Sequence, residues 1–253
     1  MITVLSSLRQ IDQVKAILFD VNGTLRVREI HPPTQNAAYE RILKILEKTS
    51  IPETFWSELE ARYKAYGKWA QDKLVQLTES EIWLQWMLPE EPAGIVSDNA
   101  SELMLAWSER KGRVLPKPET EDLLKKLSSR GYRLGLISNT MSTLDIPGFV
   151  ERFGWQKYID VVLLSAFEKV RKPSPIPFTK AAAALGLDPS QCAYVGNKFS
   201  KDIVGCKRAG YPFGIIIRNP GKPLVDEECY DVAADIVIDS LTDLLKAFPA
   251  RAN

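Results

Sequence analysis

Short apolar runs and amphipathic segments alternate along most of the chain. The runs that are typical of buried β-strands lie at residues 14–19, 133–137, 161–164, 193–195, 213–217 and 236–238. Segments with a helical pattern separate them, at residues 120–129, 177–185 and 241–248. Strands that alternate with helices are typical of a parallel sheet whose strands are joined by crossover helices. The pattern therefore predicts an α/β fold.

From about residue 30 to residue 113 the pattern becomes helical throughout. Apolar residues recur there at intervals of three and four, and prolines separate the helical stretches. Examples of these apolar residues are Ala38, Ile42, Leu46, Trp56, Leu59, Tyr63, Ile82 and Trp86. We expect an α/β core formed by residues 1–29 and 114–253, with residues 30–113 inserted as a helical unit. Five of the six tryptophans fall in the insertion, where we expect them to be core residues, although one or two could face the functional site.

Composition restricts the partners of the protein. The chain has 253 residues, a net charge of +1 and three cysteines without metal-ligand spacing. A charge near zero does not favour nucleic acid or an anionic membrane, so an anionic small molecule would have to be held by local groups. Residues 1–15 do not resemble a signal peptide, and no apolar stretch is long enough to span a bilayer. We expect a cytoplasmic protein, and the oligomeric state stays open.

Polar residues that could take part in catalysis or binding follow four of the predicted strands. Asp20 follows the first strand, Ser138 and Asn139 follow the second, and Lys172 lies a short loop beyond the third. Residues 196–202, which begin Gly-Asn and end in Asp, follow the next strand. Ligands of such sheets bind beyond the carboxyl ends of the strands. Any one of these residues could be an ordinary turn residue, but their common placement predicts a single site.

These segments resemble the four motifs of the haloacid dehalogenase-like superfamily. Residues 19–25, Phe-Asp-Val-Asn-Gly-Thr-Leu, resemble the first motif, which is usually Asp-x-Asp-Gly-Thr. Residues 136–140 resemble the second motif, residues 170–173 the third and residues 194–210 the fourth. The resemblance implies a Rossmann-like parallel sheet with helices on both faces. It also implies that the insertion is a helical cap, placed between the first and second motifs, whose two crossings to the core lie side by side.

The resemblance assigns a role to each matching residue. Asp20 would attack phosphorus, or carbon in a dehalogenase, and water would hydrolyse the resulting aspartyl intermediate. Ser138 would donate a hydrogen bond to the substrate, and Lys172 would keep Asp20 ionised and neutralise charge in the transition state. Further residues expected to contact the substrate are Thr24, Asn139 and Arg26. Arg26 and its neighbour Arg28 could instead be solvated charges where the core meets the insertion.

A magnesium ion is the cofactor that the resemblance implies. Asp20, the backbone carbonyl of Asn22 and a side chain at position 197 would bind the ion, and Asp202 would orient this shell from behind. We expect the side chains of Asp20, Ser138, Lys172, Asn197 and Asp202 to lie in one cleft.

Two positions depart from the family pattern. Asn22 stands where an aspartate normally protonates the leaving group and activates water, and an amide cannot exchange a proton near neutral pH. General acid–base catalysis contributes on the order of 100- to 10,000-fold in rate. Asn197 stands where a carboxylate normally binds magnesium, a hard cation that prefers anionic oxygen ligands. The sequence therefore predicts weaker metal binding and reduced or specialised activity.

Three functions are compatible with this pattern. A phosphatase whose substrate has a good leaving group needs little acid catalysis. A binding or regulatory protein could keep the fold without turnover, and a deliberate inactivation at both positions would leave the same two asparagines. The third function is that of a metal-independent 2-haloacid dehalogenase, an enzyme that lacks the second aspartate of the first motif. Residues 22–26 of this chain are otherwise phosphatase-like, which argues against this function.

Two other residues are expected to be structural. Lys169 could replace Lys172 as the lysine of the third motif, but the Lys-Pro pair at 172–173 matches that motif better. His31 is the one histidine of the chain and is expected to be an ordinary linker residue.

Overall fold

A seven-stranded sheet forms the centre of the protein. The computed structural model describes residues 3–4, 8–218 and 232–251. The strand order is β1-β9-β8-β7-β2-β5-β6, and all neighbours are parallel except β1, which pairs antiparallel with β9. The strands are β1 (Thr3–Val4), β2 (Ala16–Phe19), β5 (Arg133–Ser138), β6 (Val161–Leu164), β7 (Cys192–Gly196), β8 (Phe213–Ile217) and β9 (Ile236–Ile238). Each predicted strand is present, with ends that differ by at most two residues.

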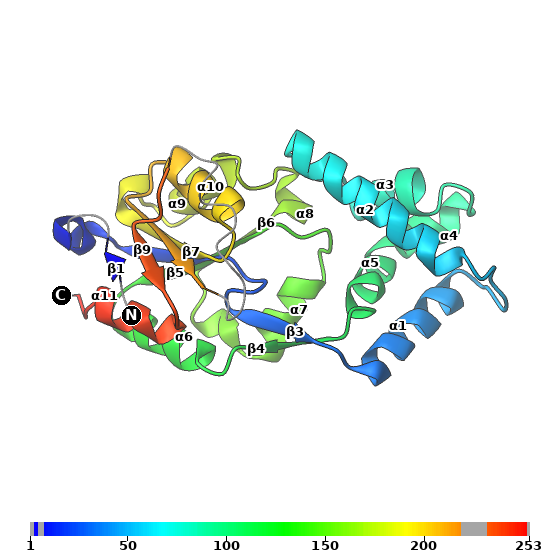
Figure 1. The fold of residues 1–253 in the computed structure, drawn as a ribbon, viewed down its shortest axis with the longest axis horizontal. Coiled ribbons are helices and arrows are strands. Elements are labelled where there is room, and N and C mark those ends of the chain that lie inside the picture. Colours follow the sequence, from blue (N-terminus) through cyan, green and yellow to red (C-terminus); the bar gives the residue numbers. More distant parts are fainter. Residues whose placement is uncertain (1–2, 5–7, 219–231, 252–253) are drawn as a thin grey trace.

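Helices cover both faces of the sheet (Figure 1). Ile17 and Phe19 of β2 point to the face covered by α6 (Thr120–Ser129), α7 (Asp145–Arg152) and α11 (Leu244–Ala247). Ala16 and Leu18 point to the opposite face, covered by α9 (Ile176–Ala184) and α10 (Val204–Arg208). This alternation follows from the two-residue period of a β-strand. The predicted α/β fold with helices on both faces is confirmed.

Shorter helical turns connect these elements. They are α8 (Ser165–Glu168), the 3-10 helices Leu8–Gln13, Trp155–Lys157, Pro189–Gln191 and Leu241–Asp243, and the π-helical turns Trp83–Met87 and Phe199–Ile203.

The insertion consists of helices with a hydrophobic core of their own. These helices are α1 (Pro32–Ile45), α2 (Phe55–Lys73), α3 (Glu79–Ile82), α4 (Ala93–Asp98) and α5 (Ala100–Glu109). Trp83 and Trp107 are fully buried in this second core, as expected for aromatic residues at helical spacing. His31 begins the first of these helices, because its side chain accepts the backbone N–H of Thr34. No helix in the described part of the chain is long and apolar enough to cross a membrane.

An antiparallel ribbon joins the insertion to the core. β3 (Arg26–Glu29) leaves the core and β4 (Arg113–Pro116) returns to it, and the two strands pair along their whole length. The two crossings therefore lie side by side (Figure 1). The hydrophobic pattern did not indicate this ribbon, because β3 contains three charged residues and one valine. The exact division of the chain at residues 29 and 114 stays a prediction.

The insertion also contacts the core at a second place. The loop after α2 pairs with the segment that follows α8, since Gln76 donates its backbone N–H to Lys169 and Arg171 donates its own to Leu74. The hydrogen bonds are 2.9 and 3.0 Å long. This contact brings the insertion beside the segment that carries Lys172.

Close packing between β2, β5 and β6 makes a stability test possible at Gly135. A Cβ atom there would lie 2.6 Å from Val161 Cγ1 and 3.1 Å from Leu18 Cδ2. We expect Gly135→Ala to lower the free energy of unfolding by about 1–3 kcal/mol, as overpacking does in a filled core. Urea unfolding measures the change. Gly148→Ala is the control, because its Cβ would meet nothing within 4 Å in the exposed part of α7, and it should stabilise by up to about 1 kcal/mol. Equal stabilities for the two variants would contradict the packing described here.

Candidate active site

The carboxyl ends of the central strands meet at one edge of the sheet. β2 lies between β5 and β7, and Asp20 directly follows its last residue. Ser138 is the last residue of β5, and Asn197 follows the end of β7. The chain continues from β2 toward one side of the sheet and from β7 toward the other. Ligands of open α/β sheets bind at such a reversal point, so these three residues occupy a favourable place for a site.

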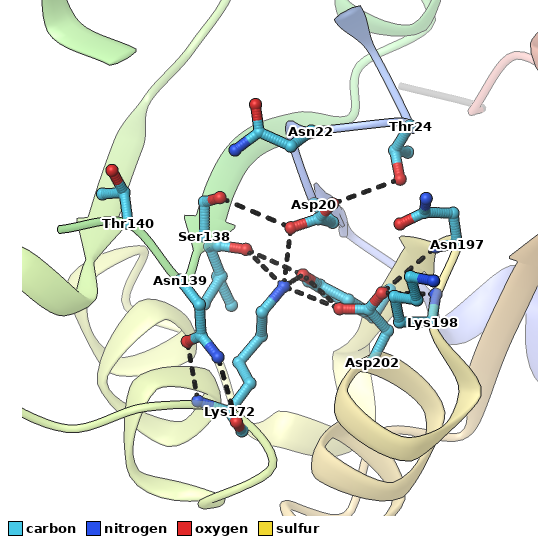
Figure 2. Close-up of polar contacts among 12 residues, drawn as sticks. Asp20, Asn22, Thr24, Ser138, Asn139, Thr140, Lys172, Asn197, Lys198 and Asp202 are labelled. Atoms are coloured by element: carbon cyan, nitrogen blue, oxygen red, sulfur yellow. Dashed lines mark hydrogen bonds and ion pairs between the residues drawn. The ribbon is translucent and has the colours of Figure 1, made fainter. Parts of the chain in front are cut away.

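Lys172 brings two buried carboxylates together (Figure 2). Its Nζ donates to Asp20 Oδ1 at 2.8 Å and to Asp202 Oδ1 at 2.6 Å. The hydroxyl of Tyr194 and the carbonyl oxygen of Ile137 lie 2.7 and 2.9 Å from the same nitrogen. The side chain of Lys172 is only 2% exposed. Four acceptors surround three N–H groups, so the ammonium is solvated entirely by the protein.

Burial and opposite charges together set the ionisation of this cluster. Burial raises the pKa of Asp20, while the positive charge of Lys172 opposes the increase. Burial alone would lower the pKa of Lys172, but Asp20 and Asp202 outweigh it, so that pKa is raised. Burial also raises the pKa of Tyr194 well above its usual value, which keeps its hydroxyl neutral. Lys172 is therefore held as a cation that two carboxylates share.

Asp202 supports the site from behind. Its Oδ2 accepts the backbone N–H groups of Asn197 at 3.1 Å and Lys198 at 2.9 Å, while its Oδ1 binds Lys172. A Cβ on Gly196 would lie 2.4 Å from the Asp202 side chain, so only glycine allows this approach. Protein donors occupy both carboxylate oxygens. A role of Asp202 in orienting a metal shell stays a prediction.

Asn139 positions the backbone of Lys172. Its Oδ1 accepts the N–H of Lys172 at 2.8 Å, and its Nδ2 donates to the carbonyl of the same residue at 3.0 Å. Both polar atoms of the amide are thus engaged. The hydroxyls of Ser138 and Thr24 each lie 3.4 Å from a carboxylate oxygen of Asp20, contacts long enough for a ligand to replace. Substrate contacts of Asn139, Ser138 and Thr24 stay predictions.

Arg26 is a buried structural residue, which corrects the expectation of a solvated charge at the start of the insertion. It is 1% exposed and forms a bidentate ion pair with Asp145, with N–O distances of 3.0 and 2.7 Å. Its Nε donates to Asn22 Oδ1 at 2.9 Å, and Phe149 lies under the guanidinium at 4.8 Å. Asp145 neutralises this charge and Arg26 holds the side chain of Asn22, while a substrate contact of Arg26 stays a prediction.

The side chain of Asn22 is consequently turned away from Asp20 and Lys172 (Figure 2). Asp145 was not predicted, since it belongs to none of the motifs and lies 119 residues from Arg26 in the sequence. The basic residues Arg171 and Lys201 near the site were not predicted either. Lys169, the alternative to Lys172, is exposed and donates to the carbonyl oxygen of Ala166.

Asn197 presents a buried acceptor without a partner. Its Oδ1 is buried and forms no hydrogen bond with the described residues. A Cβ on Gly23, whose φ is +85°, would lie 2.3 Å from Asn197 Nδ2, so the glycine makes room for the amide. An oxygen in this state, lining the same cavity as Asp20, fits a hard cation. Within the described ranges, no group of three or more His, Cys, Asp or Glu side chains could hold a metal ion. A metal ion at this site would therefore also need other oxygen ligands, such as Asn197 Oδ1.

Two adjoining cavities lie at this edge of the sheet. The smaller one has a volume of about 140 Å³ and is lined by Asp20, Ser138 and Lys172 among others. The larger one has a volume of about 560 Å³ and reaches the insertion at Tyr63 and Ser108. The residues that line both cavities are Asn22, Asn139, Asn197 and Lys198. No tryptophan lines either cavity, so the described tryptophans of the insertion contribute to its core rather than to these walls.

Known proteins share this sequence pattern. A family model for haloacid dehalogenase-like hydrolases matches residues 14–210. Glyceraldehyde 3-phosphate phosphatase of Methanopyrus kandleri is 28% identical over 200 residues, which cover 78% of this chain and 81% of that protein. The protein of the same name from Pyrococcus abyssi is 28% identical over 241 residues, covering 92% and 93%.

Solved structures share the fold. A 2-haloacid dehalogenase from Pseudomonas syringae pv. tomato superposes with a TM-score of 0.67 at 21% identity, covering 92% of this chain and 97% of that one. A phosphatase of the same superfamily from Thermococcus onnurineus superposes with a TM-score of 0.59 at 22% identity, covering 94% and 100%. At these identities the likeness concerns the fold alone, and it includes enzymes of two different activities.

The charge cluster predicts that two substitutions affect stability differently. Lys172→Met leaves Asp20 and Asp202 buried without a counter-charge, and we expect the free energy of unfolding to fall by about 3–5 kcal/mol. Asp20→Asn leaves the ion pair between Lys172 and Asp202 intact and should not destabilise the protein. Urea unfolding measures both changes.

The pH dependence gives the second part of this test. Because the pKa of Asp20 is raised in the folded state, the parent loses stability as the pH rises through that pKa. The variant Asp20→Asn has no such group, so its stability relative to the parent should increase over the same pH range. A relative stability that falls as the pH rises would contradict the shift.

Proposed function

This chain belongs to the haloacid dehalogenase-like hydrolase family, and we propose that it is a phosphatase that acts on a small phosphorylated metabolite through Asp20. The observation that carries the proposal is the geometry of this carboxylate. Lys172 and Ser138 contact Oδ1, whereas the hydroxyl of Thr24 lies 3.4 Å from Oδ2. One oxygen is therefore oriented by the protein and the other is available as a nucleophile. The relatives whose names describe phosphatases support the same activity.

Two displacements at phosphorus make up the reaction. In the first, Asp20 Oδ2 forms a bond to phosphorus while the ester P–O bond breaks, and the departing alkoxide takes a proton from water. In the second, water attacks phosphorus and gives up one proton to the hydroxide left by the first step, the bond to Oδ2 breaks, and inorganic phosphate leaves with Asp20 regenerated. Lys172 supplies fixed positive charge beside the reacting oxygen, and Ser138 is placed to donate to a phosphoryl oxygen. Positioning and positive charge are the main requirements of phosphoryl transfer.

Magnesium fits the remaining oxygen atoms of the site. Asp20, the main-chain carbonyl of Asn22 and Asn197 Oδ1 would hold the ion. When bound, it supplies positive charge that balances the phosphoryl oxygens. Since only one of these three ligands is a carboxylate, we infer that the ion binds weakly.

The missing proton donor limits the kind of ester that reacts well. Asn22 cannot protonate a leaving group, and its amide is bound to Arg26. An alcohol of low pKa leaves without this help, whereas a simple alkoxide does not. We therefore propose that the protein acts fastest on phosphates with good leaving groups, such as acyl, enol or aryl phosphates.

A phosphate-release screen tests the proposal. Purified protein is incubated with a panel of phosphorylated metabolites, with magnesium and with a chelator in its place. We expect release that Asp20→Asn abolishes. No release from any ester in the presence of magnesium would overturn the proposed function.

Dehalogenation is the second candidate. The orientation of Asn22 favours dehalogenation. Its side chain is bound to Arg26 and turned away from Asp20, which suits a reaction that uses no acid at position 22. Chloride or fluoride release from a 2-haloacid, independent of magnesium, would identify this activity. If neither assay gives turnover, the third candidate, a binding protein that keeps the fold, has the stronger case.

Restoring an acid at position 22 should raise the rate selectively. We expect Asn22→Asp to increase kcat for an alkyl phosphate by about 100-fold, at the low end for acid catalysis, because Arg26 would stabilise the ionised form of the new carboxyl. An aryl phosphate, which needs little acid help, is the matched control substrate and should gain much less. Steady-state kinetics with both substrates measures the difference.

Deamidation has to be monitored in the same experiment. Asn22 is exposed and precedes a glycine, a sequence that favours conversion to aspartate. Mass spectrometry of the peptide around residue 22 shows how much of the parent already carries an acid. Equal gains with the alkyl and aryl substrates would contradict the assigned role of this position.

Position 197 should control metal affinity instead of proton transfer. We expect Asn197→Asp to lower the magnesium concentration at half-maximal rate by about tenfold or more, because it adds an anionic ligand. Calorimetric titration of magnesium into the protein without substrate should show the same change. Unchanged affinity in both measurements would place the ion elsewhere.

A further inference from the structure

The larger cavity continues from the one that contains Asp20. The two cavities share four lining residues, so a molecule whose phosphate lies beside Asp20 extends into the larger space. Its volume of about 560 Å³ is within the usual range for small-molecule sites. The nature of its walls therefore bears on what the rest of the substrate is.

Positive charge predominates on these walls. The basic residues that line the cavity are Arg26, Arg28, Lys111, Arg171 and Lys198, and the one acidic residue in its lining is Asp145. Since Asp145 forms the bidentate ion pair with Arg26, these two charges cancel. Four basic residues are left without a carboxylate at ion-pair distance in the part of the chain that the structure describes.

Arg171 is the most informative of these four. It is only 7% exposed, and its guanidinium has one hydrogen-bond partner among the described residues, the neutral side chain of Gln76. Its Nε is buried with no partner. Burying a guanidinium without a counter-charge costs free energy, and a bound anion would offset that cost. The backbone of Arg171 is held by Leu74 of the insertion, so the group is fixed in place.

The opposite wall carries two more cations that have no carboxylate at ion-pair distance among the described residues. Arg28 donates to the carbonyl oxygens of Ser108 and Gly112 at 2.9 and 2.7 Å, which orients its charge without neutralising it. Lys111 lies over the ring of Tyr63, with Nζ 5.1 Å from the centroid. The cavity thus has fixed positive charges on the core side and on the insertion side.

From these walls we infer that the substrate carries a second anionic group, a carboxylate or a second phosphate, which Arg171 binds with help from Arg28 and Lys111. The inference rests on the proposed phosphatase function and narrows it to small phosphate esters with two anionic ends. A guanidinium suits either group, because its N–H donors match the oxygens of carboxylates and phosphates.

A pair of matched ligands tests the inference. Propyl phosphate and 3-(phosphonooxy)propanoate share a three-carbon chain, but only the second ends in a carboxylate. Their dissociation constants are measured by calorimetry with Asp20→Asn, which binds without turnover. We expect the carboxylate to tighten binding by about 10- to 100-fold, the usual range for a charged hydrogen bond. 1,3-Propanediol bisphosphate, as a third ligand, shows whether a second phosphate is preferred.

Variants assign the effect to the proposed residue. In the Asp20→Asn background, the further substitution Arg171→Met should bring the dissociation constants of the two ligands to the same value, and Arg171→Lys should retain part of the preference for the carboxylate. Arg208→Met removes an exposed arginine outside both cavities and should change nothing. Because Arg171 also contacts Gln76, Lys111→Gln on the exposed rim provides a second test and should weaken the preference about two- to fivefold.

The possible failures are distinguishable. If both ligands bind Asp20→Asn equally well, the second-anion site is wrong and the phosphatase proposal is unaffected. If neither ligand binds, the second-anion site and the phosphatase proposal are both wrong. A preference for the carboxylate that survives in Arg171→Met and in Lys111→Gln would also overturn the assignment.

Discussion

The contact between the Lys172 ammonium and two buried carboxylates is the interaction on which the rest of the site depends. It joins Asp20 at the end of β2 to Asp202 beyond the end of β7, and it crosses the point where the sheet connections reverse. Such a cluster is stable only if its geometry is fixed and its remaining polar groups are satisfied. Asn139 fixes the backbone of the lysine, and the backbone N–H groups of Asn197 and Lys198 satisfy Asp202. Catalytic positioning and folding stability therefore share the same contacts.

The arrangement also explains why the two asparagines have different consequences. Asn197 retains an oxygen that faces the site and lacks a partner, so its substitution for a carboxylate changes charge more than geometry. Asn22 is bound to an arginine that is itself bound to Asp145. An acid placed at position 22 would therefore enter an existing network of charges. The family pattern describes which residues occupy these positions, while the surrounding contacts determine what those residues can do.

Much of the fold could be predicted from the sequence because its signals are local. A buried strand that ends in a polar residue, such as the one before Asp20, shows both its position and the edge of the sheet where it ends. The network around Arg26 and the burial of Arg171 could not be predicted in this way. Each depends on a partner more than 90 residues away in the sequence, and an isolated Asp145 or Gln76 carries no local signal. The β3–β4 ribbon was missed for a similar reason, since pairing with residues 84 to 90 positions away stabilises a strand that has only one apolar residue.

Arg26 belongs to two structures at once, since it is the first residue of β3 and the group that holds Asn22. β3 is one of the two strands by which the insertion is attached, so a rotation of the insertion strains the segment that contains this guanidinium. The ion pair with Asp145 anchors the segment to α7 of the core and resists that strain. A rotation of the insertion would therefore also displace the group that holds the side chain at position 22. A substitution at Asp145 would loosen both the segment and this side chain, although this residue touches neither Asp20 nor Lys172 through any hydrogen bond that the structure describes.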